Sequence, residues 1–209
     1  MTKAEITELV KGYLSGGSTT QDMMHKVDAR RLQLYIAAAY QDIIYEVFRT
    51  DQSGLSLYAK TFTGVAVAAD AVTGLYMSEL PEAIIQLPGV ASAVRSVRFD
   101  TGTELIFVPL EADLMESMKM LDAGTYAINP TIGYCLRGTN SIEFMNFPLA
   151  EAGETLRIDL VIPFTAFSAS EQVHLPSGKV SVLIEAVIGL LTGRPRVDLV
   201  NDNAEAEVK

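Results

Sequence analysis

The longest regular pattern of apolar positions lies between Val27 and Arg49. Apolar side chains recur there at intervals of three and four residues, the spacing that places them on one side of an α-helix. We therefore predict one long helix over these residues, with a buried apolar face. The face comprises Leu32, Ile36, Ala39, Tyr40, Ile43, Ile44 and Val47.

The same helix is predicted to be apolar on a second side as well. Leu34, Ala38 and Tyr45 lie roughly opposite the buried face, where a surface helix is usually polar. Two explanations remain open. Another part of the same chain covers this side, as in domains built of layers, or a neighbouring subunit contacts it. In the second case the interface would comprise Arg31, Leu34, Tyr35, Ala38, Asp42, Tyr45, Glu46 and Arg49.

Helices are also predicted near the two ends of the chain. Residues Thr2–Leu14 have amphipathic spacing, and Thr2 with Glu5 matches the capping box that starts many helices. Residues Lys179–Thr192 are apolar almost all round and long enough to favour a helix over a strand. The acidic, polar residues 197–209 are expected to form a flexible tail.

Residues 55–165 show short β-rich runs separated by turn-forming residues. We predict strands near Leu57–Phe62, Val65–Ala68, Leu75–Ser78, Val94–Phe99, Glu104–Val108, Thr131–Arg137, Ser141–Phe147 and Thr155–Ile162. The sequence Gly138-Thr139-Asn140 predicts a hairpin turn, and Glu111–Leu121 has helical spacing. Strand runs segregated from helix runs indicate an α+β protein, with N- and C-terminal helices packed on a central antiparallel β-sandwich or mixed sheet.

Length and composition narrow the classes of function. A chain of 209 residues suggests a single domain, with two small domains as the alternative. The single domain would be helical over 1–50, strand-rich over 55–165, and end in the 179–192 helix and the tail. With 16 basic and 26 acidic residues, the net charge of -10 argues against a general nucleic-acid-binding surface. The most apolar run, Val180–Leu191, is shorter than the roughly 20 residues of a membrane span, so no membrane partner is expected.

The residues that could carry out chemistry are few and scattered. The two histidines, His25 and His174, lack companions at the spacing of metal ligands, and no glycine-rich phosphate loop follows a strand. The single cysteine, Cys135, lies in a predicted strand and is interpreted as a small core residue. A Cys135–His174 nucleophile pair stays open as an alternative. We expect no catalytic residues, no cofactor and no metal.

The order of the predicted parts resembles the head-to-tail adaptor and ring proteins of short-tailed bacteriophages, including podovirus tail tubular proteins and crAss-like phage ring proteins. The resemblance consists of a short helix, a Gly/Ser loop, the long helix RRLQLYIAAAYQDIIYEVFR, a strand-rich middle with hairpins, an apolar helix after a proline, and an Asn201-Asp202 tail. It covers most of the chain as a layout, without an invariant motif.

The resemblance implies a structural virion protein that is made in the host cytoplasm and located in the neck of the particle. About a dozen copies would close into a ring that joins the portal protein to a tail or next-ring protein. DNA would pass through the channel without specific binding, because an acidic wall offers phosphate no cations. The alternatives are a ligand- or carbohydrate-binding β-sandwich module, which would need an aromatic-lined pocket, and an enzyme of an unrecognised type.

Overall fold

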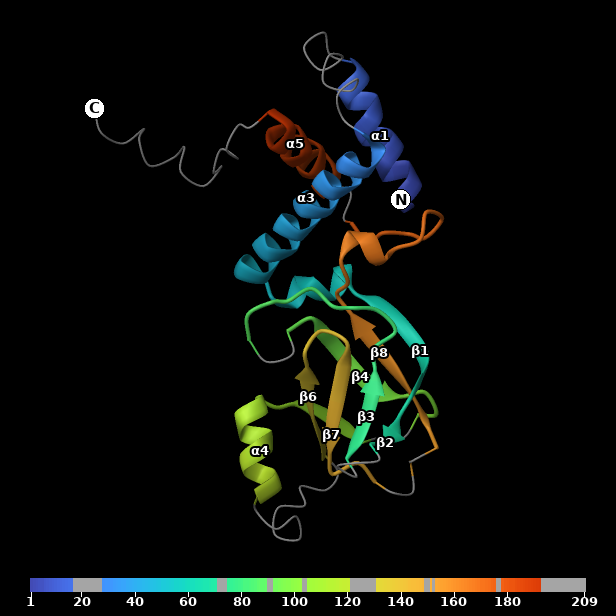
Figure 1. The fold of residues 1–209 in the computed structure, drawn as a ribbon, viewed down its shortest axis with the longest axis vertical. Coiled ribbons are helices and arrows are strands. Elements are labelled where there is room, and N and C mark those ends of the chain that lie inside the picture. Colours follow the sequence, from blue (N-terminus) through green and yellow to red (C-terminus); the bar gives the residue numbers. More distant parts are fainter. Residues whose placement is uncertain are drawn as a thin grey trace, which may run out of the picture. The chain divides into compact units, whose positions relative to one another are not determined.

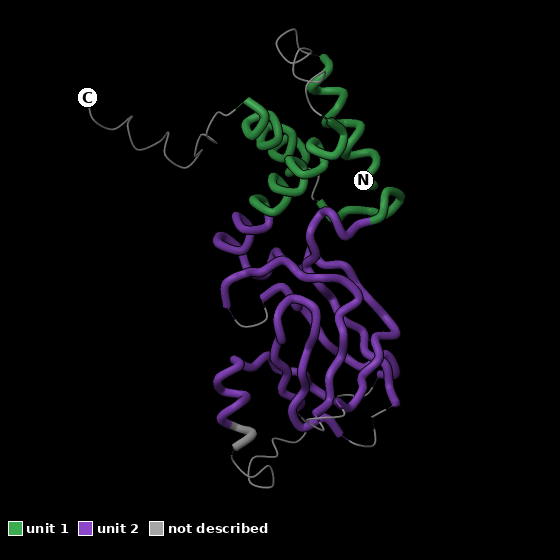
Figure 2. Tube along the Cα trace, viewed as in Figure 1, with its two compact units in different colours: residues 1–43, 168–209 green, residues 44–167 purple. Residues whose placement is uncertain are grey.

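The computed structural model describes residues 1–16, 28–70, 75–89, 92–102, 105–120, 131–148, 151, 153–175 and 178–192, without the side chains of 118–120. The chain divides into two compact units, which Figure 2 shows in different colours. Unit 1 takes both chain ends, Met1–Ile43 and Ser168–Lys209, and unit 2 takes the continuous middle, Ile44–Phe167. The predicted helical ends thus fall mainly in unit 1, and the predicted strands fall in unit 2.

Unit 1 contains helices α1 (Lys3–Gly16) and α5 (Lys179–Thr192), which contact each other, and the first part of α3 (Ala29–Thr50). The predicted capping box is confirmed at the start of α1. The Thr2 amide donates to Glu5 Oε2 at 2.8 Å, and the Glu5 amide donates to Thr2 Oγ1 at 3.2 Å. These two bonds satisfy amides that have no partner within the helix.

Helix α3 has the buried face that its spacing predicts. All seven predicted residues are buried, from Leu32 to Val47. The helix begins at Ala29, and the carbonyl of Asp28 accepts the first helical hydrogen bond from Leu32 at 3.0 Å. The predicted start at Val27, the Gly/Ser loop and the C-terminal tail lie outside the described residues.

Unit 2 contains two β-sheets and the short helix α4 (Ala112–Met120), and Figure 1 shows their arrangement. The three-stranded antiparallel sheet has the order β1 (Lys60–Ala66), β8 (Thr155–Leu160), β4 (Val94–Phe99). The five-stranded sheet has the order β2 (Ala68–Ala69), β3 (Tyr76–Glu79), β7 (Ser141–Met145), β6 (Thr131–Arg137), β5 (Ile106–Pro109). Since β5 runs parallel to β6 and the other pairs are antiparallel, this sheet is mixed. The α+β prediction is confirmed.

Aromatic side chains connect the two sheets of unit 2. Phe99 of β4 lies 5.2 Å from Phe107 of β5 and 5.6 Å from Phe147, measured between ring centroids. Phe144 of β7 lies 5.5 Å from Phe147 and 6.0 Å from Phe107. Ring pairs at these separations stabilise a fold by more than the apolar area that they bury. We therefore expect this cluster to be a main source of the stability of unit 2.

The strand predicted near Leu57–Phe62 is wrong in its first half. A 3-10 helix, η1 (Ser53–Tyr58), precedes β1, which begins only at Lys60. Asp51 Oδ1 accepts hydrogen bonds from the amide and the hydroxyl of Ser53, at 3.0 and 2.5 Å, and so favours a tight turn. The burial of Leu55 and Tyr58, three residues apart, matches the three-residue turn of this helix.

Most other predicted elements are observed within a few residues of their expected bounds. The strands β4 and β6 and the helix α5 have the predicted ends. The hairpin is confirmed, since Arg137 pairs with Ser141 across a turn in which Gly138 has a φ of 68°. In β1 the register shifts between Phe62 and Val65, where Gly64 has a φ of 70°, a bulge geometry that favours glycine.

Candidate functional site

The part of the predicted subunit interface that belongs to unit 1 lies on the exposed side of α3. Arg31, Ala38 and Asp42 are exposed, Leu34 is 60% exposed, and Tyr35 is half-buried. Leu34 and Ala38 are four residues apart and therefore neighbours on the helix surface. Of the two explanations for this apolar side, burial by the described part of the same chain is thus not observed for Leu34 and Ala38.

The remaining predicted interface residues belong to unit 2. Arg49 is exposed, whereas Tyr45 and Glu46 are half-buried. The Tyr45 hydroxyl donates to the backbone carbonyl of Gln86 at 2.7 Å, so this side chain is held by its own chain. Sequence reasoning missed the contact because Gln86 is 41 residues away and carries no matching pattern. Leu34 and Ala38 therefore form the centre of the candidate interface, and Tyr45 does not.

Unit 2 has an open pocket of about 510 Å³ where the strands β4 and β5 lie beside each other. It is lined by Gln52, Ser92, Val94, Arg95, Ser96, Val97, Leu105, Ile106, Phe107, Pro109 and Tyr134. Arg95 is the cationic side chain of this lining. Burial raises the pKa of Tyr134 to about 12, although the positive charge of Arg95 acts to lower it. The phenol therefore stays neutral at physiological pH.

Cys135 has the structural role that its sequence context predicts. It is buried in β6 and packs in an apolar cluster with Met115 of α4 and Met145 of β7. A thiol enclosed in this way is not exposed to a substrate. His174 is exposed. Within the described ranges, no three His, Cys, Asp or Glu side chains are placed to hold a metal ion.

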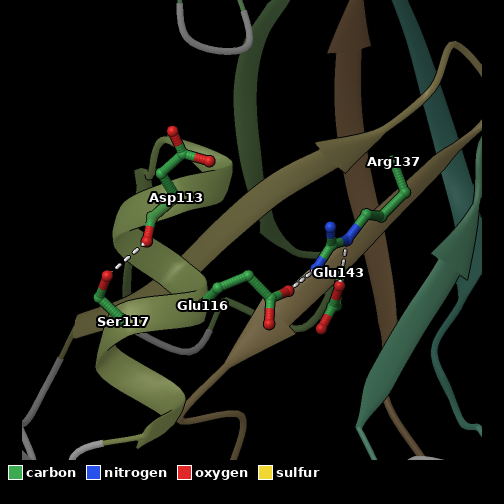
Figure 3. A network of polar contacts seen from close by, with 5 residues as sticks. All are labelled: Asp113, Glu116, Ser117, Arg137 and Glu143. Carbon is green, nitrogen blue, oxygen red and sulfur yellow. Dashed lines mark hydrogen bonds and ion pairs between the residues drawn. The ribbon is translucent and has the colours of Figure 1, made fainter.

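A charged network connects α4 to the β6–β7 hairpin (Figure 3). Arg137 donates from Nε to Glu143 and from Nη2 to Glu116. The hydrogen bonds to Glu143 and then Glu116 raise the pKa of Arg137 above its usual value. The side chain of Glu143 is only 5% exposed and that of Glu116 is 50% exposed. Losing the contact between Arg137 and Glu143 should therefore lower stability more than losing the contact between Arg137 and Glu116.

Asp159 occupies the centre of the three-stranded sheet. It accepts hydrogen bonds from Thr61 at 2.5 Å and from Ser96, and Arg98 Nη2 lies 3.9 Å from its Oδ2. Burial acts to raise the pKa of Asp159, but these hydrogen bonds and the charges of Arg98 and Arg157 lower it below its usual value. The ionised carboxylate therefore links all three strands.

We predict that this carboxylate stabilises the fold above the unfolded-state pKa, near 3.9, and that its contribution is lost as pH falls through the lower folded-state pKa. Asp159→Asn should lower the free energy of unfolding at pH 7 by about 1–2 kcal/mol and flatten its decline toward low pH. Urea titrations at several pH values measure both. Thr61→Ala should give part of the effect, and Thr63→Ala, at an exposed position of the same strand, should give none. An unchanged pH profile in Asp159→Asn would contradict the assignment.

Comparison of the sequence with models of protein families and with curated proteins found no match. Among the helices of the described ranges, none has both the length and the apolar content that crossing a bilayer requires.

Proposed function

We propose that this protein is a structural subunit of a ring at the head–tail junction of a short-tailed bacteriophage, where it joins the portal to the tail. The observation that carries the proposal is the exposed pair Leu34 and Ala38, on a helix whose opposite face is buried throughout. Apolar side chains on an exposed helix face are suited to bury against a second copy.

The charge of the chain supports a place around a DNA channel. Its net charge of -10 repels phosphate, so DNA can move past the subunits without being retained. The described helices and strands follow the order of the predicted layout on which the resemblance rests. The pair Leu34 and Ala38 would supply the contact between neighbouring subunits of the ring.

The proposal is tested by mixing the protein with the portal ring encoded in the same genome and imaging the mixture by negative-stain microscopy. The wild type is expected to form a second ring stacked on the portal. Leu34→Glu should prevent the ring, because a charge at a buried contact typically costs about 2–4 kcal/mol, a 30- to 800-fold loss of affinity. Sedimentation velocity measures the loss.

Leu57→Glu is the matched control. Leu57 is 66% exposed, close to the 60% of Leu34, and lies on η1 instead of α3. The Leu57→Glu substitution introduces the same charge as Leu34→Glu and should leave ring assembly intact. A wild type that stays monomeric with the portal present would overturn the ring proposal, and equal effects of the two substitutions would overturn the interface on α3.

A further inference from the structure

The pocket between β4 and β5 contains a cationic side chain with one unused hydrogen-bond donor. Arg95 donates from Nη1 to the Ser92 carbonyl at 3.3 Å, but its Nε is buried without a hydrogen-bond partner among the described residues. A buried donor without an acceptor is costly, and such groups in native proteins call for an explanation, of which a role in binding is one. The unused Nε lies on the same edge of the guanidinium as Nη2.

The neighbouring polar groups do not neutralise Arg95. The hydroxyl of Ser92 donates to the Pro88 carbonyl at 2.7 Å, and that of Ser96 donates to Asp159. Asp159 in turn is held by Thr61 and its contact with Arg98, and it does not line the pocket. Arg95 therefore lies in the pocket without an ion pair to any described carboxylate.

We propose that this pocket binds a carboxylate group, which Arg95 holds through Nε and Nη2. A planar guanidinium pairs with a planar carboxylate through two parallel, charge-assisted hydrogen bonds. Nε is screened from solvent, so the pair requires rotation of the outer torsions of Arg95, and the two new bonds favour that rotation. The volume suits a small ligand or one acidic side chain, and the apolar walls at Val97 and Phe107 would contact its carbon atoms.

The carboxylate can come from a small molecule or from a protein segment, and titrations of the full chain distinguish the two sources. The probes are succinate, a synthetic peptide of residues 197–209, whose sequence is acidic, and inorganic phosphate. The readout is the Nε–H resonance of Arg95 in ¹H–¹⁵N spectra, with calorimetry for affinity. We expect saturable binding of succinate, of the peptide or of both, at a lower dissociation constant than phosphate.

Matched variants isolate the role of Arg95. Arg95→Gln should weaken carboxylate binding at least tenfold. Arg95→Lys should also weaken it, because an ammonium keeps the positive charge but lacks the two parallel N–H donors of the planar guanidinium. Arg98→Gln, an exposed arginine on the same strand, should bind like the wild type. Thermal unfolding of each variant verifies that it folds.

Each outcome is decisive. Binding of the peptide alone assigns the carboxylate to a protein segment, and binding of succinate alone or of both probes shows that a small carboxylate suffices. Shifts that do not saturate, equal losses in Arg95→Gln and Arg98→Gln, or phosphate binding as tight as succinate would overturn the proposal. Because the titrations concern a pocket within unit 2, their outcome is independent of whether the protein forms rings.

Discussion

Replacing Arg137 with alanine is expected to lower the free energy of unfolding by about 2–4 kcal/mol. The guanidinium donates to Glu143, whose side chain is 5% exposed, and to Glu116 on α4. Without it, the buried carboxylate of Glu143 loses the cation that compensates its desolvation. Chemical denaturation at pH 7 measures the change.

Burial separates the roles of the two carboxylates that Arg137 contacts. Glu116→Gln should cost at most about 1 kcal/mol, because an exposed ion pair is weak. The double variant Arg137→Ala/Glu143→Gln should be more stable than Arg137→Ala alone, since it also removes the buried carboxylate charge that has lost its contact with Arg137. A double variant no more stable than the single one would show that packing of the arginine side chain, and not its charge, accounts for the loss.

Replacing Phe144 with alanine should lower the free energy of unfolding by about 3–5 kcal/mol. The ring is fully buried and contacts Phe107 and Phe147, so truncation leaves a cavity in the aromatic cluster between the two sheets. The lost burial of the removed ring atoms and the cavity that they leave both lower the free energy of unfolding. Thermal and denaturant unfolding, followed by near-ultraviolet circular dichroism, detect the loss of the rigid aromatic environment.

Two controls show whether the cluster is responsible. Phe144→Leu keeps most of the volume and should cost less than half as much. Leu57→Ala removes an exposed side chain and should change stability by no more than about 0.5 kcal/mol. A Phe144→Ala protein as stable as Leu57→Ala would contradict the assignment of this cluster as a main source of the stability of unit 2.

The sequence was informative wherever an element depends on local periodicity. The spacing of α3 predicts its buried face, and the apolar run Lys179–Thr192 predicts α5 with the observed bounds. The alternation of apolar and polar residues along Val94–Phe99 likewise predicts β4 with the observed bounds. The capping box at Thr2 could also be recognised, because its two hydrogen bonds connect residues only three apart.

The candidate interface was predicted only in part. The exposed positions Leu34 and Ala38 follow from helical spacing, since both lie opposite the buried face. The half-buried state of Tyr45 does not follow from it, because the hydroxyl is held by Gln86, a residue distant in sequence. The 3-10 helix at Ser53–Tyr58 was also missed, since Asp51 and β-rich neighbours favour different local structures.

The sequence by itself determined the helices of α1, α3 and α5, most of the strands, the α+β class and the acidic character of the chain. Only the tertiary structure decided that β5 runs parallel to β6, that Arg137 joins α4 to the hairpin, and that Arg95 lines a pocket with an unused donor. The physical reason is the separation along the sequence of the residues that interact. Helical spacing, alternation and caps act between residues a few positions apart, whereas strand order and the pairing of charges depend on which distant segments fold together.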